Sequence, residues 1–450
     1  MYNFAGKKVV IMGLGLHGGG VGVALWLSKQ GAEILVTDMK TRRELKESIA
    51  KLKKYSNIKY TLGKHLVEDF KNIDIVVANP IVRQDNKYLK VAKKSGAKIY
   101  NDVSLFLEQC PAKVIGITGT KGKSTTAALI YHMIKSKDVH LGGNIRISPF
   151  SFLDKLSAKD LVILEMSSWQ CEGLIAIKRS PEISVLTNLG IDHLNTYKSF
   201  AAYAKAKALI FKYQHKGDYA VLNRQDKYTS KLVKNIRAKK RYFSINSKSG
   251  NYISKDHLYY NNKKLLAIDK LPLIGDHNRV NILAALEVCS ILNISVPRIK
   301  KSLPSFKGLS GRMEVVKRFK GITYINDTTA TSPLAAIASI SSIASPVILI
   351  AGGNDKKLDI ENLAPVIMNR VMSVVLLPGT VTNKLITLFK KNNFIDYSFA
   401  STMKDAVKQA SAKAKKDDIV LLSPGATSFG SFINEFDRGD QFIKEVKNLK

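Results

Sequence analysis

The sequence predicts an α/β protein of three domains built on mostly parallel sheets. Its length is the first observation, because 450 residues correspond to about three domains at roughly 150 residues each. The second is the alternation of short apolar runs with polar, helix-like stretches, which is typical of parallel strands joined by crossover helices. The third is a pair of glycine-rich loops, each of which directly follows an apolar run.

The first series of elements lies between residue 8 and about residue 100, with strands predicted at KVVIMG, EILVTD, IDIVVANP and AKIYND. After the first of them, GLGLHG places Gly13, Gly15 and Gly18 at the spacing G-x-G-x-x-G, and Asp38 ends the next strand. This is the Rossmann fingerprint in its expected context, and it predicts a pyrophosphate at a helix N-terminus. The pattern leaves open a nicotinamide or flavin cofactor, another nucleotide diphosphate, or a tight turn without a ligand.

The second series begins at AKVIGITGT and continues through DLVILEMSS, PEISVLTNL and DYAVLN. Its first loop fails the strict Walker A pattern, because Ile117 stands where a glycine is required. The parts of a phosphate-binding loop are nevertheless there: the turn glycines Gly119 and Gly122, Lys123 for the β- and γ-phosphates, and the Ser124 hydroxyl for Mg²⁺. The loop therefore predicts ATP binding.

Two further strands of this series end in candidate metal ligands. LEMSSWQ delivers Glu165, and TNLGIDH delivers Asp192 and His193. Ligands of parallel α/β sheets gather at the carboxyl ends of the strands, so these side chains are expected beside Lys123 and Ser124. Each has an ordinary structural explanation when taken singly. Together with the phosphate loop they favour a metal–nucleotide site.

The remaining segments complete the domain plan. Short strand-and-turn segments between residues 239 and 270 predict hairpins on the edge of the central sheet. The stretch SLPSFKGLSGR, near 302–312, has the Pro, Gly and Ser content of an interdomain linker. A third series then runs through GITYIND, SPVILIAGG, VMSVVLLPG and DIVLLSPGA. We therefore expect a Rossmann-like domain at 1–103, a central P-loop-type ATPase domain at 104–304, and a C-terminal Rossmann-like domain at 305–450.

Composition argues against several classes of protein. The net charge of +35 suggests a nucleic-acid partner, but the lysines are spread along the chain and no nucleic-acid motif is present. A basic ATPase stimulated by DNA or RNA is kept as a rival hypothesis. No apolar run of 18 or more residues predicts a membrane span. The three cysteines lack CxxC spacing, which fits the reducing cytoplasm.

The chain resembles the Mur ligases over essentially its whole length. Nine motifs occur in family order: TGTKGKST, GGNI, EMSSWQ, DHLNTY, HNRVNILAA, GRMEVV, NDTTAT, AGGNDK and LLSPGATSFGSF. SSWQ and SPGATSFGSF favour the members that add D-glutamate, and the DNPR motif of the members that add diaminopimelate or lysine is absent. Alternatives are another Mur-type amide ligase and a folylpolyglutamate synthase, although the N-terminal Rossmann-like domain argues against the latter.

The resemblance implies an ADP-forming ligase that joins D-glutamate to UDP-N-acetylmuramoyl-L-alanine through an acyl phosphate, with ATP and two Mg²⁺ ions, in peptidoglycan precursor synthesis. The implied ATP-binding residues are Gly119, Thr120, Lys121, Gly122, Lys123, Ser124, Thr125, Asn278, Asn281, Arg312 and Asp327. The UDP sugar is expected at Leu14, Gly15, Leu16, His17, Asp38, Asn79, Asn144 and Ser167, and D-glutamate at Thr331, Lys356 and Ser428. No nucleic acid is implied, and we expect a monomer.

The resemblance also implies the catalytic and metal-binding residues. The catalytic set is Lys123, Glu165, His193 and Lys207, and the Mg²⁺ ligands are Ser124, Glu165, His193 and Lys207. Most lysines in so basic a chain face water. In this family, however, the lysine aligned with Lys207 reacts with CO₂ to form a carbamate, an anion that can bridge to Mg²⁺.

Three positions depart from the family pattern. Gly311 stands where a histidine commonly precedes the arginine, and Thr329 stands where NDSKAT has lysine. Ile81 stands where a glycine commonly follows the proline. These departures put individual substrate contacts in doubt and leave the phosphate and metal residues intact.

Overall fold

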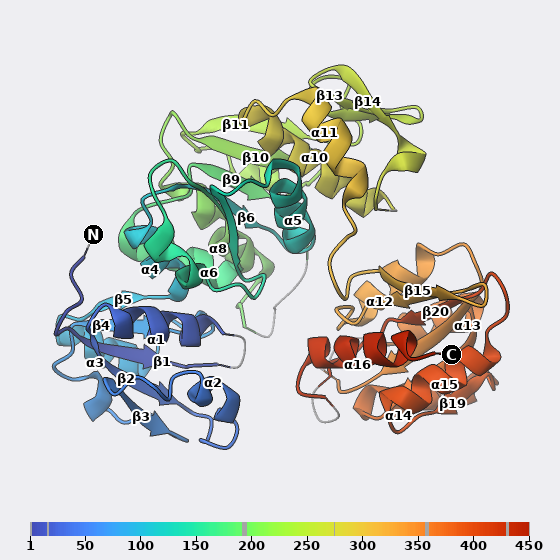
Figure 1. Cartoon of the computed structure of the whole chain (residues 1–450), viewed down its shortest axis with the longest axis horizontal. Helices are drawn as coiled ribbons and strands as arrows, with labels where there is room; N and C mark the ends of the chain where they lie inside the picture. Colours follow the sequence, from blue (N-terminus) through green and yellow to red (C-terminus); the bar gives the residue numbers. More distant parts are fainter. Residues whose placement is uncertain are drawn as a thin grey trace. The chain divides into compact units, whose positions relative to one another are not determined.

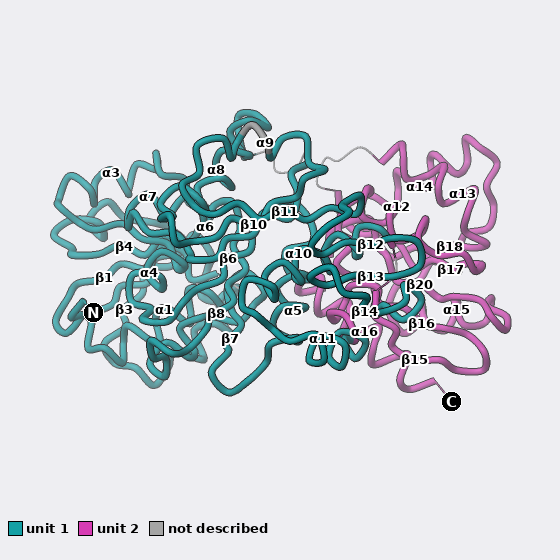
Figure 2. The backbone as a smooth tube through the Cα atoms, turned by 90° about the horizontal axis from the view of Figure 1, so that it is seen from above, with its two compact units in different colours: residues 1–271, 276–306 teal, residues 272–275, 307–450 magenta. Residues whose placement is uncertain are grey.

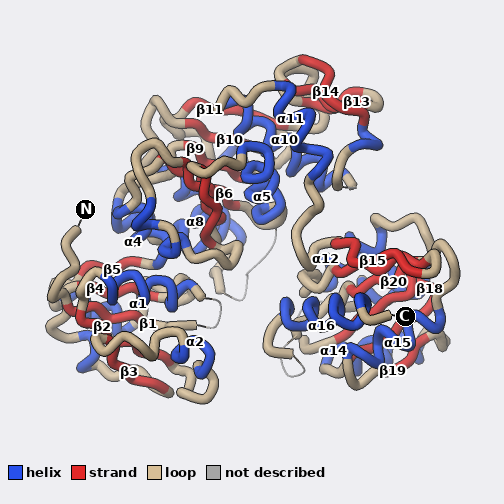
Figure 3. Tube along the Cα trace, in the orientation of Figure 1, coloured by secondary structure: helices blue, strands red, loops and turns tan. Residues whose placement is uncertain are grey.

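The structure is a computed structural model that describes residues 2–15, 18–190, 196–273, 275–355, 360–428 and 432–449, without the side chains of residues 230 and 231. The chain divides into two compact units (Figure 2). Unit 1 comprises residues 1–271 and 276–306, and unit 2 comprises residues 272–275 and 307–450. Helices alternate with strands in both units (Figure 3), and each of the three expected domains has its own parallel or mostly parallel sheet. The prediction of a three-domain α/β fold is confirmed.

The N-terminal sheet of unit 1 is parallel, with the order β3-β2-β1-β4-β5 (Figure 1). Its elements are β1 (Lys8–Met12), α1 (Gly19–Lys29), β2 (Glu33–Asp38), α2 (Lys46–Ala50), β3 (Ile58–Leu62), η1 (Glu68–Phe70), β4 (Ile75–Ala78), α3 (Lys87–Lys94), β5 (Lys98–Tyr100) and α4 (Asp102–Gln109). The direction of winding reverses between β1 and β4. The carboxyl end of β1 is therefore the switch point at which such sheets bind ligands.

The central sheet is also parallel, with the order β11-β10-β9-β6-β8-β7. Its strands are β6 (Lys113–Thr118), β7 (Val139–Gly143), β8 (Leu161–Glu165), β9 (Ile183–Leu186), β10 (Tyr219–Asn223) and β11 (Lys239–Phe243). Its main helices are α5 (Lys123–Ile134) and α10 (Asp276–Ile291) on one side, and α6 (Ser168–Glu172) and α8 (Phe200–Lys212) on the other (Figure 1). Ile117 on β6 pairs with Glu165 on β8, so the two loops predicted to be functional leave the sheet side by side.

Shorter elements complete this part of unit 1. They are η2 (Pro149–Ser151), η3 (Leu153–Lys155), α7 (Leu174–Ile177), α9 (Thr229–Leu232), η4 (Ile268–Lys270), α11 (Val296–Ser302) and η5 (Leu303–Ser305). The last two immediately precede the boundary between the units, where the composition predicts a linker.

The prediction of hairpins between residues 239 and 270 is confirmed for β12, β13 and β14, but their placement on the edge of the central sheet is wrong. β11 joins the central sheet as a parallel edge strand, because the segment containing α9 carries the chain back before β11 begins. The strands β12 (Tyr252–Ser254), β13 (His257–Tyr260) and β14 (Lys263–Ala267) form a separate antiparallel sheet. Alternation of apolar and polar residues does not reveal which sheet a short strand will join.

One apolar core continues from the N-terminal domain into the central domain, and specific contacts reinforce it. The ring of Trp26 on α1 packs against that of Phe150 with their centroids 5.3 Å apart, and Trp26 Nε1 donates to Asp154 Oδ1 at 2.6 Å. A Cβ on Gly22 would overlap the Ser148 side chain, so α1 lies directly against the central domain. The first two domains therefore form one packed body, and a site between their sheets has fixed walls.

Unit 2 contains a sheet with the order β15-β16-β20-β17-β18-β19, in which only β15 is antiparallel to its neighbour. Its strands are β15 (Glu314–Phe319), β16 (Ile322–Asn326), β17 (Val347–Gly352), β18 (Val371–Leu377), β19 (Tyr397–Phe399) and β20 (Ile419–Leu422). One apolar core lies under α12 (Pro333–Ser341), α13 (Leu363–Arg370) and α14 (Thr380–Lys391), and a second lies under α15 (Met403–Lys413) and α16 (Glu435–Lys447).

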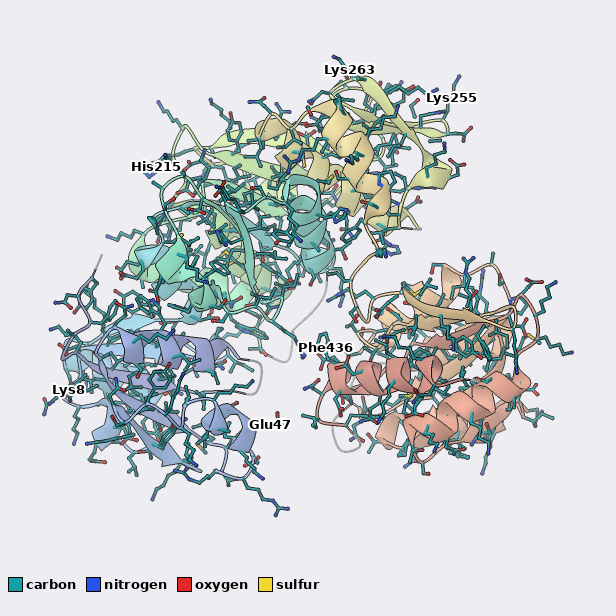
Figure 4. All side chains as sticks on the ribbon, viewed as in Figure 1. Lys8, Glu47, His215, Lys255, Lys263 and Phe436 are labelled. Atoms are coloured by element: carbon teal, nitrogen blue, oxygen red, sulfur yellow. The ribbon has the colours of Figure 1, made fainter. Side chains whose placement is uncertain are left out.

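The basic side chains are distributed over many elements. Lys8, Lys255 and Lys263, which are labelled in Figure 4, come from three different strands or turns, and all are exposed. This distribution agrees with a lysine-rich solvated surface. Among the helices that the structure describes, none is long and apolar enough to cross a membrane.

Candidate active site

The turn from β6 into α5 requires glycine at two positions. Gly119 has φ +150° and Gly122 has φ +81°. A Cβ on Gly119 would overlap the Thr187 hydroxyl, and a Cβ on Gly122 would overlap the Asn281 side chain. The backbone can therefore follow this path only with glycine at both positions, and the N-terminus of α5 that it leads into is the kind of helix end that binds anions.

The segment that follows β9 holds this loop in place. Thr120 N donates to Asn188 O at 2.9 Å, and Lys121 N donates to Asn188 Oδ1 at 3.0 Å. The Thr187 hydroxyl in turn donates to Lys121 O at 2.6 Å. These contacts fix the loop before any ligand binds, so little ordering is needed on phosphate binding.

Lys123, Ser124 and Thr125 occupy the first turn of α5, as the sequence predicts. The Lys123 ammonium donates to Gly119 O and to Thr120 O, both at 3.0 Å, so it lies within the curve of the loop. A cation at this position faces the same space as the helix N-terminus. The turn is therefore suited to hold a polyphosphate.

Glu165 ends β8 with only 1% of its surface exposed. Its Oε1 accepts a hydrogen bond from Asn144 Nδ2 at 3.0 Å. Its Oε2 is buried and has no hydrogen-bond partner among the described residues. An unpaired buried carboxylate oxygen is costly, and Mg²⁺ prefers oxygen ligands of this kind, so Glu165 fits the metal role that the sequence predicts.

Helix α8 places Lys207 close to the phosphate loop. The Tyr203 hydroxyl donates to Thr120 Oγ1 at 3.2 Å, and the Lys207 ammonium lies 4.7 Å from the centre of the Tyr203 ring. Lys207 is only 2% exposed. Burial raises the pKa of the neighbouring Cys171 thiol to about 11, and the Lys207 charge opposes that rise. Lys207 is thus a buried cation near the loop, and not one of the solvated surface lysines.

The described residues include only part of the expected set of metal ligands. Asp192 and His193 lie outside the described residues. Among the residues that are described, no three His, Cys, Asp or Glu side chains gather as a metal site. Glu165 is the one described member of the expected set that carries a carboxylate.

A cavity of about 280 Å³ lies between the N-terminal and central sheets. Five of the residues expected to bind the UDP sugar line it: Leu14, Gly15, Asn79, Asn144 and Ser167. Leu16 and His17 lie outside the described residues. Sequence reasoning missed other lining residues, among them Asp102, Arg146, Trp169 and Gln170. The cavity thus includes the first glycine-rich loop and is bounded by both domains of unit 1.

Asp38 ends β2 and supports the cavity without lining it. Its Oδ2 accepts a hydrogen bond from Gly15 N at 3.3 Å, and its Oδ1 accepts one from Lys40 N at 2.9 Å. The side chain is 7% exposed. Asp38 therefore holds the glycine-rich turn that forms one wall of the cavity.

A hydrogen-bonded chain crosses from one domain to the other at Gln170. Ser167 caps α6 by accepting from Gln170 N at 3.2 Å, and Ser167 N donates to Gln170 Oε1 at 2.9 Å. Gln170 Nε2 donates to Asp102 Oδ2 at 3.0 Å, and burial raises the pKa of Asp102. The S-x-x-Q capping box can be read from the sequence. No sequence motif marks its partner Asp102, at the start of α4, as part of this site.

Helix α10 places the two expected nucleotide-binding asparagines side by side. Asn281 Nδ2 donates to Asn278 Oδ1 at 3.4 Å, and Asn281 faces Gly122 as described above. α10 therefore brings both side chains to the phosphate loop of unit 1.

In unit 2, Asp327 follows β16 and is 5% exposed. Its Oδ1 accepts from Met313 N at 3.1 Å, and its Oδ2 accepts from Ser339 Oγ at 2.5 Å and from Ser423 Oγ at 3.0 Å. Burial raises the pKa of Asp327 to about 6, and the nearby Arg312 charge opposes the rise. Asp327 and Arg312, which are both expected to bind ATP, thus lie close together.

The residues expected to bind D-glutamate are only partly described. Ser428 is 3% exposed, and its hydroxyl has no hydrogen-bond partner among the described residues. Thr331 is half-buried just before α12. Lys356 lies outside the described residues. A buried hydroxyl without a partner fits a site that receives a polar ligand.

Comparison with known proteins finds one family along the chain. The model for the "Mur ligase MurD-like, N-terminal domain" matches residues 7–101. The model for the "Mur ligase middle domain" matches residues 117–289, and that for the "Mur ligase, glutamate ligase domain" matches residues 311–425.

Relatives and solved structures give the same result. A UDP-N-acetylmuramoylalanine–D-glutamate ligase of Roseiflexus sp. is 36% identical, over 99% of both chains. One of Borreliella burgdorferi is 39% identical, over 98% of this chain and 97% of its own. The crystal structure of the UDP-N-acetylmuramate-alanine ligase MurC of Thermotoga maritima, at 20% identity, covers 99% of this chain and 100% of its own with a TM-score of 0.66. The MurF ligase of the same organism in complex with ADP, also at 20% identity, covers 85% of this chain and 97% of its own with a TM-score of 0.58.

Proposed function

The chain belongs to the Mur ligase family, and we infer that it is an ATP-dependent ligase that adds D-glutamate to UDP-N-acetylmuramoyl-L-alanine in peptidoglycan precursor synthesis. The observation that carries this inference is the full-length match to ligases that bear this activity in their names. The MurD-like N-terminal domain supports a UDP-sugar substrate over a folate substrate. The rival hypothesis of a nucleic-acid-stimulated ATPase gains no support from these relatives.

The chemistry must overcome the inertness of a carboxylate toward an amine at neutral pH. The terminal alanine carboxylate attacks the γ-phosphorus of ATP, and ADP leaves as the acyl phosphate forms. The amine of D-glutamate then attacks the acyl carbon, loses a proton and displaces inorganic phosphate. One ATP is consumed for each amide bond, and the products are ADP, phosphate and the extended nucleotide peptide.

The residues of the phosphate loop supply charge for the first step. Two anions must approach each other, and the Lys123 ammonium and the N-terminus of α5 stabilise the transferring phosphoryl group. Glu165 Oε2 and the Ser124 hydroxyl would hold Mg²⁺, with His193 completing the set. Mg²⁺, when bound, neutralises phosphate charge and orients the γ-phosphate. Two such ions and a carbamate on Lys207 belong to this proposal.

The proposal assigns each part of the substrates to the residues expected to bind it. The UDP group lies against Leu14, Gly15 and Asn79, and the muramoyl-alanine end lies toward Asn144 and Ser167. Asn144 also bonds Glu165, so the same side chain would join the substrate end to the metal ligand. In this proposal, Asn278, Asn281, Arg312 and Asp327 contact ATP, and Thr331, Lys356 and Ser428 bind D-glutamate. A monomer in the cytoplasm stays a prediction.

Phosphate release from ATP tests the assignment directly. The wild-type protein is incubated with ATP, MgCl₂ and UDP-N-acetylmuramoyl-L-alanine, and the added amino acid is varied among D-glutamate, L-glutamate, L-lysine and diaminopimelate. Release is expected only with the nucleotide sugar and D-glutamate together, and Lys123→Ala is expected to abolish it. Robust turnover with L-lysine or diaminopimelate would contradict the function, and turnover with a folate acceptor would support the folylpolyglutamate alternative.

A further inference from the structure

The turn at residues 309–314 of unit 2 carries Arg312, and a local carboxylate holds its backbone. Glu314 Oε2 accepts from Gly311 N at 2.8 Å and from Ser310 Oγ at 2.9 Å. Both contacts join residues of the same turn. They fix its shape, and Asn326 Nδ2 on β16, which donates to the same Glu314 oxygen at 3.2 Å, ties the turn to the sheet.

The segment that follows β16 holds the backbone on both sides of Arg312. Asp327 Oδ1 accepts from Met313 N at 3.1 Å. Thr329 contributes two further hydrogen bonds to one acceptor, because its N and its Oγ1 donate to Gly311 O at 3.0 and 2.9 Å. That carbonyl belongs to the peptide bond that joins Gly311 to Arg312. Thr329 thus holds the peptide bond that precedes Arg312, and Asp327 holds the one that follows it.

The fit at Gly311 leaves no room for a side chain. Gly311 has φ +73°, and a Cβ there would lie 2.8 Å from Thr328 Cγ2 and 3.3 Å from Thr329 Cγ2. The two threonine methyl groups therefore occupy the space beside the glycine. Gly311 and Thr329 are two of the positions that depart from the family pattern. In the structure they are in direct contact, so the two departures belong to the same local packing arrangement.

A fully buried cation supports the threonine segment from behind. The Arg438 side chain is 0% exposed, and it donates through Nη2 to Thr328 O at 2.9 Å and through Nε to Thr328 Oγ1 at 3.1 Å. Its third contact runs from Nη1 to Ala426 O at 3.2 Å. Thr328 is therefore held rigidly, and Thr329 presents its hydroxyl to the turn from a fixed base.

We propose that Thr329 is a positioning residue for Arg312: its amide and hydroxyl anchor the Gly311 carbonyl and thereby set where the guanidinium meets ATP. The inference rests on the proposed function, in which Arg312 contacts ATP. It assigns Thr329 to the scaffold of the nucleotide site and not to contact with a substrate.

Thr329→Val removes the hydroxyl and keeps both the shape of the side chain and the amide hydrogen bond. The loss of one hydrogen bond corresponds to about a three- to tenfold rise in the KM for ATP, with the KM for the nucleotide sugar unchanged. Thr329→Ser keeps the hydroxyl and is expected to restore the wild-type value. Thr387→Val is the matched control, because the Thr387 hydroxyl donates to Asn383 O at 3.1 Å within α14 and should leave both KM values unchanged.

A double-mutant cycle separates positioning from a general structural effect. Affinity for a non-hydrolysable ATP analogue is measured by calorimetry for wild type, Thr329→Val, Arg312→Ala and the double variant. The valine substitution should weaken binding in the wild-type background and add less than twofold when Arg312 is absent. The inference would be overturned if Thr329→Val weakened binding equally in both backgrounds or left the affinity unchanged. It would also be overturned if Thr329→Ser failed to keep the wild-type KM for ATP. A wild-type protein that binds the analogue but adds no D-glutamate would contradict the proposed function alone.

Discussion

At the scale of single residues, burial distinguishes Lys207 from the lysines around it. Lys207 is 2% exposed beside the phosphate loop, whereas Lys205 on the same helix is exposed. A carbamate on Lys207 would convert this buried cation into an anion able to ligate Mg²⁺. Lys207→Ala should therefore reduce turnover to a few per cent or less, and millimolar acetate should restore part of it by filling the vacated anionic position. Phosphate release with and without acetate measures both effects.

Lys205→Ala is the matched control, since it removes the same charge from the same helix two residues away. It should retain nearly full activity and show no response to acetate. A Lys207→Ala variant that kept most of its turnover in carbonate-depleted buffer would exclude the carbamate.

Asp327 gives a pH dependence at the same scale. Burial raises its pKa to about 6, so the carboxyl is ionised at pH 7.5 and mostly neutral at pH 5. If the ionised form binds ATP, kcat/KM for ATP should fall about tenfold for each pH unit below 6. The Asp327→Asn side chain cannot ionise. The kcat/KM of this variant for ATP should therefore be low at every pH and show no such inflection. Steady-state kinetics between pH 5 and 8 would distinguish the two profiles, and an identical inflection in both proteins would assign it to another group.

At the scale of elements, the turn from β6 into α5 carries the nucleotide chemistry. Gly122 has φ +81° and faces Asn281, so Gly122→Ala is strained both by its backbone and by overlap. We expect ATP affinity to fall at least tenfold, because the N–H groups of the first turn of α5 would be displaced. Gly217→Ala is the control, since a Cβ there meets nothing within 4 Å. Calorimetric titration with ATP compares them, and equal affinities would remove the turn from the ATP site.

At the scale of the whole molecule, unit 1 behaves as one body because its apolar core spans two sheets. A ligand in the cavity between them should therefore stabilise both domains together. At a hundredfold excess over its Kd, UDP should add about 2.7 kcal/mol to the stability of unit 1, whereas NAD should add nothing. Differential scanning calorimetry measures the shift. Gly20→Ala should abolish it, because a Cβ there would overlap the backbone of Leu14. Stabilisation by NAD alone would favour a dehydrogenase-type ligand.

The amino-acid sequence is enough to predict the three-domain α/β fold, the family and the ends of the strands that carry function. Thr118, Glu165 and Asp38 end β6, β8 and β2 as the apolar runs predict. These features depend on local periodicity and on the rule that parallel strands deliver ligands at their carboxyl ends, and both can be read from consecutive residues.

Which residues from distant parts of the chain come into contact depends on how the helices and sheets pack. Lysine content says nothing of burial, so Lys207 became distinct only when α8 packed against the central sheet. Asp102 lines the cavity because the N-terminal domain packs against the central domain at Gln170. Gly311 and Thr329, which are 18 residues apart in the chain, are joined by a hydrogen bond. That β12, β13 and β14 form a sheet separate from the central one is likewise a result of packing. Each depends on contacts between segments far apart in the chain, whose free energies follow from packing and hydrogen-bond geometry and not from the residue types alone.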